Sequence, residues 1–151
     1  MKRILITGVT GLVGDGICRY FLEKKWKVFG TSRNELHSLD PLFTPIKFDL
    51  NSLNDLSKLK QCLPIDAIIH SAAKLPYTLK DKNDEKNYYK CNVDGTRSLL
   101  DWLITSKIKK FIFISSTGVC DTINSNSIET NIIKPKLNHY HISKAMGELL
   151  C

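Results

Sequence analysis

The chain has 151 residues, of which 42% are hydrophobic and 25% charged, and no apolar run approaches the ~20 residues of a membrane helix, which predicts one globular domain with no membrane partner. The formal net charge is +7, but the basic residues are scattered and no nucleic-acid motif is present, so we expect a polyanionic small molecule rather than nucleic acid as the ligand. Five cysteines without a Cys-x-x-Cys pair argue against a disulfide framework and a zinc site, and they favour a reducing, cytoplasmic compartment.

Short apolar runs rich in β-branched residues alternate with longer helical patterns. The strands are predicted, in chain order, at Arg3–Thr7, Lys27–Thr31, Pro45–Phe48, Ala67–Ser71 and Lys110–Ser115. The helices between and after them are predicted at Gly11–Lys24, Leu53–Gln61, Asn87–Ser106 and Tyr140–Cys151. Near-continuous apolar strands separated by helices indicate an α/β fold, a doubly wound parallel sheet covered on both faces.

Two longer polar stretches interrupt this alternation. Lys74–Lys86 follows the fourth predicted strand, and Gly118–Asn138 follows the fifth. Both leave the carboxyl ends of strands, where ligands bind in open α/β sheets. We therefore favour a functional role for them over plain surface loops.

A glycine-rich loop directly follows the first strand and opens the first helix. Gly8, Gly11 and Gly14 are spaced Gly-x-x-Gly-x-x-Gly, which permits a tight turn and close approach of the backbone to a pyrophosphate. The helix amino terminus adds free N–H groups and a partial positive charge. Alone, such a loop could be an ordinary turn, but its context predicts dinucleotide binding. The predicted cofactor-binding residues of this loop are Gly8, Thr10, Gly11, Leu12, Val13 and Gly14.

Six short motifs follow one another along the chain. They are the glycine loop, Asp49-Leu50, His70-Ser71-Ala72-Ala73, Asn92-Val93-Asp94-Gly95-Thr96, the serine cluster ending Phe111–Thr117, and Tyr140-His141-Ile142-Ser143-Lys144. Their order resembles the short-chain dehydrogenase/reductase superfamily, particularly its extended branch of nucleotide-sugar epimerases, dehydratases and reductases. The resemblance implies one dinucleotide-binding (Rossmann) domain over residues 1–151. It also implies cofactor contacts by Asp49 and Leu50 at the adenine, by Ser71, Ala72 and Ala73 beside the cofactor, and by Lys144 at the nicotinamide ribose.

Tyr140 and Lys144 are four positions apart, so they share one face of a helix. A free phenol titrates near ~10, and a nearby ammonium lowers that value by favouring the phenolate. We expect Tyr140 to be the general acid/base, with Lys144 and the oxidised nicotinamide tuning it. Taken alone, this spacing is more often an ordinary exposed helix pair.

Two further residues are catalytic candidates by resemblance. Ser116 is expected to bind the substrate oxygen, although Ser115 or Thr117 could take this role, and a serine here could simply cap local backbone. Asn92 is expected to support the active-site backbone and a water, or else to be a helix cap.

The end of the second strand bears on the choice of cofactor. An NAD enzyme generally places an acid there, whereas an arginine accommodates the 2′-phosphate of NADP. Ser32 occupies the likely position of the acid and Arg33 follows it, so we prefer NADP to NAD. His139 and His141 flank Tyr140, but two positions apart on a helix they face different ways, and we expect no metal.

The chain departs from the pattern at two places. Cys120 and Asp121 replace the usual Tyr-Gly of a Val-Tyr-Gly motif, and the chain stops seven residues beyond Lys144, whereas family members continue into another strand and a substrate domain. Two hypotheses follow. One is an NADP-dependent oxidoreductase, epimerase or dehydratase acting on a nucleotide sugar or related compound, and the other is a non-catalytic dinucleotide-binding module or inactive remnant. An uncovered sheet edge would also favour a homodimer.

Overall fold

The computed structural model describes residues 1–76, 85–108, 110–120 and 138–151. The chain forms two compact units. Unit 1 comprises Met1–Ala72 and Ser98–Ile114, and unit 2 comprises Ala73–Arg97 and Ser115–Cys151. Most of the two predicted polar stretches, Lys74–Lys86 and Gly118–Asn138, lies outside the described residues.

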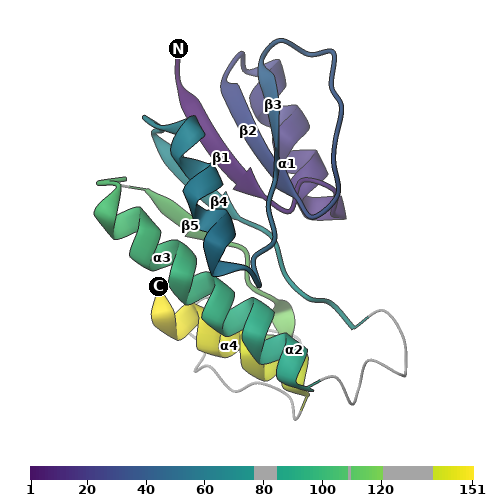
Figure 1. The fold of residues 1–151 in the computed structure, drawn as a ribbon. Helices are drawn as coiled ribbons and strands as arrows, with labels where there is room; N and C mark the ends of the chain where they lie inside the picture. The colour runs from purple at the N-terminus through teal and green to yellow at the C-terminus, as the bar shows by residue number, and fades with distance from the viewer. Residues whose placement is uncertain (77–84, 109, 121–137) are drawn as a thin grey trace. The chain divides into compact units, whose positions relative to one another are not determined.

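Unit 1 is built on a five-stranded, wholly parallel sheet in the order β3-β2-β1-β4-β5 (Figure 1). The strands are β1 (Arg3–Thr7), β2 (Lys27–Ser32), β3 (Phe43–Lys47), β4 (Ala67–His70) and β5 (Phe111–Phe113). This confirms the predicted α/β class. Strand order reverses between β1 and β4, and the carboxyl ends of strands at such a switch point are where open α/β sheets bind ligands.

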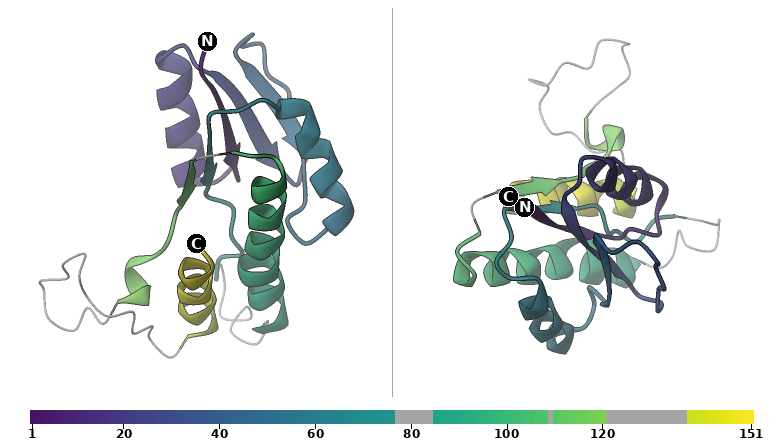
Figure 2. Two further views of the ribbon diagram at one scale, coloured as in Figure 1. Left: turned by 90° about the vertical axis from the view of Figure 1, so that its left-hand side faces the viewer. Right: turned by 90° about the horizontal axis from the view of Figure 1, so that it is seen from above.

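Helices cover both faces of this sheet. Helix α1 (Leu12–Glu23) lies on one face and the 3₁₀ helix η1 (Leu53–Cys62) on the other (Figure 2). A buried cluster forms the core on the α1 side. Its members are Ile4, Ile6, Val9, Cys18, Val28, Ala67 and Ile69. This two-sided burial explains why the strands are apolar throughout instead of alternating.

Several elements of unit 1 begin or end one or two residues from their predicted bounds; β5, for example, is Phe111–Phe113 instead of Lys110–Ser115. Two further differences have a physical cause. Strand β3 begins at Phe43 rather than at Pro45, because its pairing with β2 starts at Val28↔Phe43. Pro45 lies within it, and an edge strand tolerates proline since its outer amides need no partner in the sheet. The segment from Leu53 is a 3₁₀ helix, which is tighter than an α-helix.

Unit 2 is helical. It contains α2 (Glu85–Tyr89), the π-helical turn η3 (Lys90–Asp94), the first turn of α3 (Gly95–Thr105), the 3₁₀ turn η4 (Thr117–Val119) and α4 (His139–Leu150). Helix α4 packs against α2, η3 and η4 (Figure 1). The helix predicted at Asn87–Ser106 is therefore three consecutive segments. Among the described helices, none has both the length and the apolar character of a membrane span.

Candidate functional site

The glycine loop of unit 1 has a conformation that only glycine permits at two positions. Gly8 has a φ of +73°, and a Cβ there would lie 2.7 Å from Ala72 Cα. A Cβ on Gly14 would lie 2.2 Å from the Gly8 carbonyl oxygen. The loop therefore packs closely on the segment after β4 and on the first turn of α1, as the sequence spacing predicts.

The amino terminus of α1 is open to solvent at this loop. Gly11 is its N-cap residue, its N–H donates to Gly8 O across 3.0 Å, and it has no side chain to occupy the first-turn amides. Thr10, Leu12 and Val13 are exposed. An anion can thus reach N–H groups that carry partial positive charge, so this donor set fits a pyrophosphate.

A cavity of about 520 Å³ lies along the loop, within the usual volume of small-molecule sites. It is lined by Val9, Thr10, Gly11, Leu12, Asp15, Cys18, Arg19, Leu22, Leu36, His37, Ser38 and Phe43. Arg33 and Asp49, which were assigned to the adenosine end, are not among these lining residues. Besides the loop, the lining comes from α1, from Leu36–Ser38 after β2 and from Phe43 of β3.

Sequence reasoning missed a buried polar junction between the ends of β1 and β4. Thr7 Oγ1 lies 2.7 Å from His70 Nδ1 and accepts hydrogen bonds from the backbone N–H groups of Ser71 (3.2 Å) and Ala72 (3.1 Å). The hydroxyl therefore donates to Nδ1, which leaves the proton of a neutral His70 on Nε2. The sequence signal for this junction is that each of the two apolar strands ends in a polar residue, Thr7 in β1 and His70 in β4.

At the end of β2, the two candidate cofactor-selecting residues have different surroundings. Ser32 is buried, and its Oγ accepts from the N–H of Asn34 across 3.2 Å. Arg33 is exposed. Ser32 thus holds the turn, and Arg33 is the charged group that a ligand could reach.

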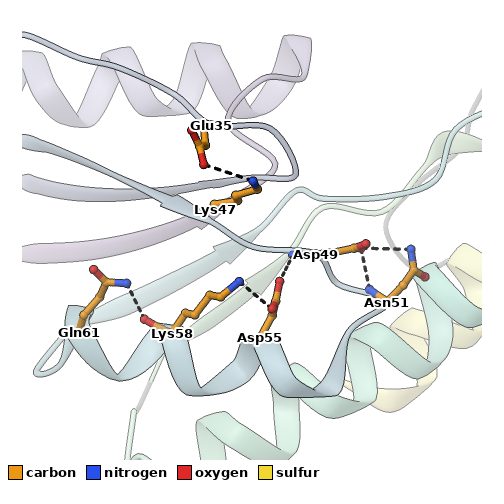
Figure 3. Close-up of polar contacts among 7 residues, drawn as sticks. All are labelled: Glu35, Lys47, Asp49, Asn51, Asp55, Lys58 and Gln61. Atoms are coloured by element: carbon orange, nitrogen blue, oxygen red, sulfur yellow. Dashed lines mark hydrogen bonds and ion pairs between the residues drawn. The ribbon is translucent and has the colours of Figure 1, made fainter.

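Asp49, the predicted adenine contact, belongs to a polar cluster that follows β3 (Figure 3). Its Oδ1 accepts from the N–H (2.9 Å) and the side-chain amide (3.2 Å) of Asn51. Its own N–H donates to Asp55 Oδ2 across 2.9 Å, and Asp55 Oδ1 lies 2.7 Å from Lys58 Nζ. The Lys58 side chain, and then the Asp49 N–H, lower the pKa of Asp55. The cluster therefore orients the Asp49 carboxylate.

In unit 2, Tyr140 and Lys144 lie one turn apart on α4. Asn138 caps this helix by accepting from the N–H of Tyr140 across 2.8 Å, and the Tyr140 ring makes an edge contact with Tyr88, with centroids 6.2 Å apart. Lys144 is 2% exposed. Burial lowers its pKa to about 8, and electrostatic interactions with Cys151, Cys91 and Glu148 act in the opposite direction. Lys144 is therefore an ammonium that releases its proton unusually easily.

Asn92 lies inside the π turn η3 rather than at a helix cap. Its Oδ1 accepts from the N–H of Lys74 (2.7 Å), while its Nδ2 donates to Lys74 O (3.2 Å) and to Ser143 Oγ (2.9 Å). Ser143 Oγ in turn donates to Tyr140 O across 2.7 Å. This network fastens the chain after Ala73 to the turn of α4 that carries Tyr140, and π turns are frequent at functional sites.

Ser116 is half-buried and caps η4, with Oγ accepting from the N–H of Gly118 across 3.3 Å. The two alternative hydroxyls differ in environment. Ser115 Oγ is buried without a hydrogen-bond partner among the described residues, whereas Thr117 is exposed. Ser116 thus makes the local capping hydrogen bond of the alternative interpretation, while the remaining lone pair and the proton of its hydroxyl are able to hydrogen-bond a substrate.

His139 contacts two side chains of α2. Its Nε2 lies 2.8 Å from Glu85 Oε1, and its Nδ1 lies 3.1 Å from the Tyr89 hydroxyl. In the part of the chain that the structure describes, no group of three or more histidine, cysteine or acidic side chains could hold a metal ion.

Comparison with known proteins assigns the chain to a family. The model of the NAD dependent epimerase/dehydratase family matches residues 4–151. A sterol-4-alpha-carboxylate 3-dehydrogenase from Dictyostelium discoideum is 34% identical over 98% of this chain and 47% of its own length. A UDP-glucuronic acid 4-epimerase from Bacillus cereus, solved with NAD, is 30% identical with a TM-score of 0.80, covering 99% of this chain and 51% of its own. The chain thus spans about half the length of these relatives.

Proposed function

The chain belongs to the NAD-dependent epimerase/dehydratase family, and from this membership we propose that it is the dinucleotide-binding part of an oxidoreductase, epimerase or dehydratase that acts on a nucleotide sugar or a related hydroxy or carbonyl compound. In this proposal the glycine loop holds the pyrophosphate at the start of α1, and Asp49 and Leu50 contact the adenine. The B. cereus relative was solved with NAD. The exposed Arg33 supports NADP as the preferred form.

The observation that carries the proposal is the burial of Lys144 one turn after Tyr140. A buried ammonium is costly to a fold, and strongly perturbed ionisable groups cluster at functional sites. The ammonium holds the Tyr140 phenolate and the nicotinamide ribose. Tyr140 takes the proton of the substrate hydroxyl, and Ser116 hydrogen-bonds the same oxygen as charge develops on it. The bound dinucleotide supplies the hydride acceptor and donor.

Binding of the dinucleotide gives the direct test. NAD⁺ and NADP⁺ are titrated calorimetrically into the chain and into two matched glycine variants, Gly14→Ala and Gly16→Ala. A Cβ at position 14 meets Gly8 O at 2.2 Å, whereas one at position 16 meets nothing within 4 Å. We expect Gly14→Ala alone to abolish binding. Equal binding by both variants, or none by the unmodified chain, would refute the proposed site.

Chemistry is tested separately with UDP-glucose, a sugar nucleotide that a structural relative, MoeE5, holds together with NAD. UDP-glucose is added to the dinucleotide-loaded chain, and the ultraviolet absorbance of the reduced nicotinamide is followed. Reduction that requires Tyr140 supports the enzyme. Dinucleotide binding without turnover of any sugar nucleotide would support the binding-module hypothesis instead.

A further inference from the structure

The turn that carries Ser116 rests on helix α4 within unit 2. Ser116 begins the turn, and its Oγ accepts from the N–H of Gly118. Gly118 and Val119 are buried, and η4 packs against α4. The placement of the Ser116 hydroxyl therefore depends on how Gly118 is seated.

The imidazole of His141 lies directly on Gly118. A Cβ built at position 118 would lie 2.3 Å from His141 Nε2, 2.4 Å from Cδ2 and 2.6 Å from Cε1. Gly8 is the one glycine with a positive φ among the described residues, so the backbone at Gly118 has a conformation open to any residue. The histidine ring, and not the backbone, is what a side chain at position 118 would have to displace.

The same ring also reaches the proposed general acid/base. His141 follows Tyr140 in α4, and the two ring centroids lie 5.3 Å apart at an interplanar angle of 57°. One imidazole therefore contacts both the turn that holds Ser116 and the Tyr140 ring. The family resemblance had assigned roles to Tyr140 and Ser116 but none to His141.

We propose that His141 is a positioning residue whose planar ring seats Gly118 on α4, and so sets the place of the Ser116 hydroxyl relative to Tyr140. This inference rests on the proposed function, in which Ser116 and Tyr140 bind one substrate oxygen. We expect any planar ring at position 141 to seat the turn, provided that position 118 has no Cβ.

The test is a double-mutant cycle on the 151-residue chain. Amide hydrogen exchange at position 118 and the melting temperature are measured for Gly118→Ala, His141→Ala and the double variant, with Gly16→Ala as the control for a glycine-to-alanine change. We expect Gly118→Ala to speed exchange on the order of tenfold, because the Cβ displaces the ring and loosens the turn. His141→Ala in that background should return exchange to that of His141→Ala alone. Additive effects of the two changes, or a Gly118→Ala variant that behaves like Gly16→Ala, would overturn the proposal.

A conservative change separates ring shape from imidazole chemistry. His141→Phe should keep exchange slow beside Gly118 and should fail to rescue Gly118→Ala. In the dinucleotide-loaded chain with UDP-glucose, Gly118→Ala should lower kcat at unchanged dinucleotide affinity, and the double variant should return kcat to the value of His141→Ala alone. Unchanged kcat in Gly118→Ala would refute the positioning role. If neither the unmodified chain nor any variant binds NAD⁺ or NADP⁺ or turns over, the proposed function fails, while the exchange cycle still decides whether His141 seats the turn.

Discussion

Asn92 Nδ2 donates to Ser143 Oγ across 2.9 Å, and both side chains are buried. Ser143 Oγ also donates to the Tyr140 carbonyl oxygen. The Asn92 side-chain amide hydrogen-bonds both the backbone N–H and the backbone C=O of Lys74. One asparagine thus joins three segments of unit 2 that are far apart in sequence.

Replacing Asn92 by alanine should lower the free energy of unfolding by about 3 kcal/mol, because the part-buried N–H and C=O of Lys74 and the buried hydroxyl of Ser143 each lose a hydrogen bond. Urea denaturation measures this loss. Lys90→Ala is the matched control, since Lys90 is exposed in the same π turn, and it should change stability by less than ~0.5 kcal/mol. A loss no larger than that of the control would show that the network carries no stability.

The buried Lys144 should make stability rise with pH above about 8. Burial lowers its pKa from 10.5 to about 8, so between these values the folded chain has released a proton that the unfolded chain still holds. Below about pH 8 Lys144 is charged in both the folded and the unfolded chain, so the folded state bears the full cost of burying that charge. The gain up to pH 10.5 should be about 3 kcal/mol relative to Lys144→Met, measured by denaturation across this range. Parallel pH profiles for the two proteins would contradict this.

Asp55 should act on the dinucleotide indirectly, by fixing the backbone of Asp49. Asp55→Asn weakens the charge-assisted bond to the Asp49 N–H, which should raise the dinucleotide Kd roughly fivefold, or about 1 kcal/mol. Glu35→Gln, in an exposed ion pair with Lys47 at 3.2 Å, is the control and should leave the Kd unchanged. Since the folded pKa of Asp55 is lowered, its contribution to stability should be present above its ordinary value of 3.8 and vanish as pH falls through the folded value.

Arg33→Ala should selectively weaken the binding of NADP⁺. Loss of a bidentate contact to the 2′-phosphate should cost about 1.5–3 kcal/mol of NADP⁺ affinity, while NAD⁺, which lacks this phosphate, should bind as before. Arg97→Ala removes another exposed guanidinium, on α3, and serves as the control. If the unmodified chain binds NAD⁺ and NADP⁺ equally, the preference for NADP is wrong.

Tyr140→Phe should lower turnover ~10²–10⁴-fold at unchanged dinucleotide affinity, because only the proton-transferring hydroxyl is lost. Tyr20→Phe, on an exposed tyrosine of α1, should keep full turnover. Lys144→Ala should harm both turnover and dinucleotide binding, whereas Ser116→Ala should mainly lower turnover. Steady-state rates and calorimetric Kd values separate these patterns, and full activity in Tyr140→Phe would make the tyrosine structural.

Features that depend on neighbouring residues could be read from the sequence. The alternation of strands and helices follows from apolar periodicity, and β1 was predicted with its observed bounds. The glycine loop was recognisable because turn geometry and helix start are set within a few residues. The shared helix face of Tyr140 and Lys144 follows from the helical repeat alone. Boundaries set by pairing between strands, such as the start of β3, were not predictable in this way.

Tertiary structure alone decided which polar groups meet. Thr7 binds His70 and the amides after it from 63 to 65 positions away, and Asn92 reaches Ser143 from 51 positions away. The seating of His141 on Gly118 and the burial that lowers the Lys144 pKa arise in the same way. Local sequence sets which backbone conformations are favourable, whereas desolvation and side-chain hydrogen bonding depend on which distant segments fill the surrounding volume.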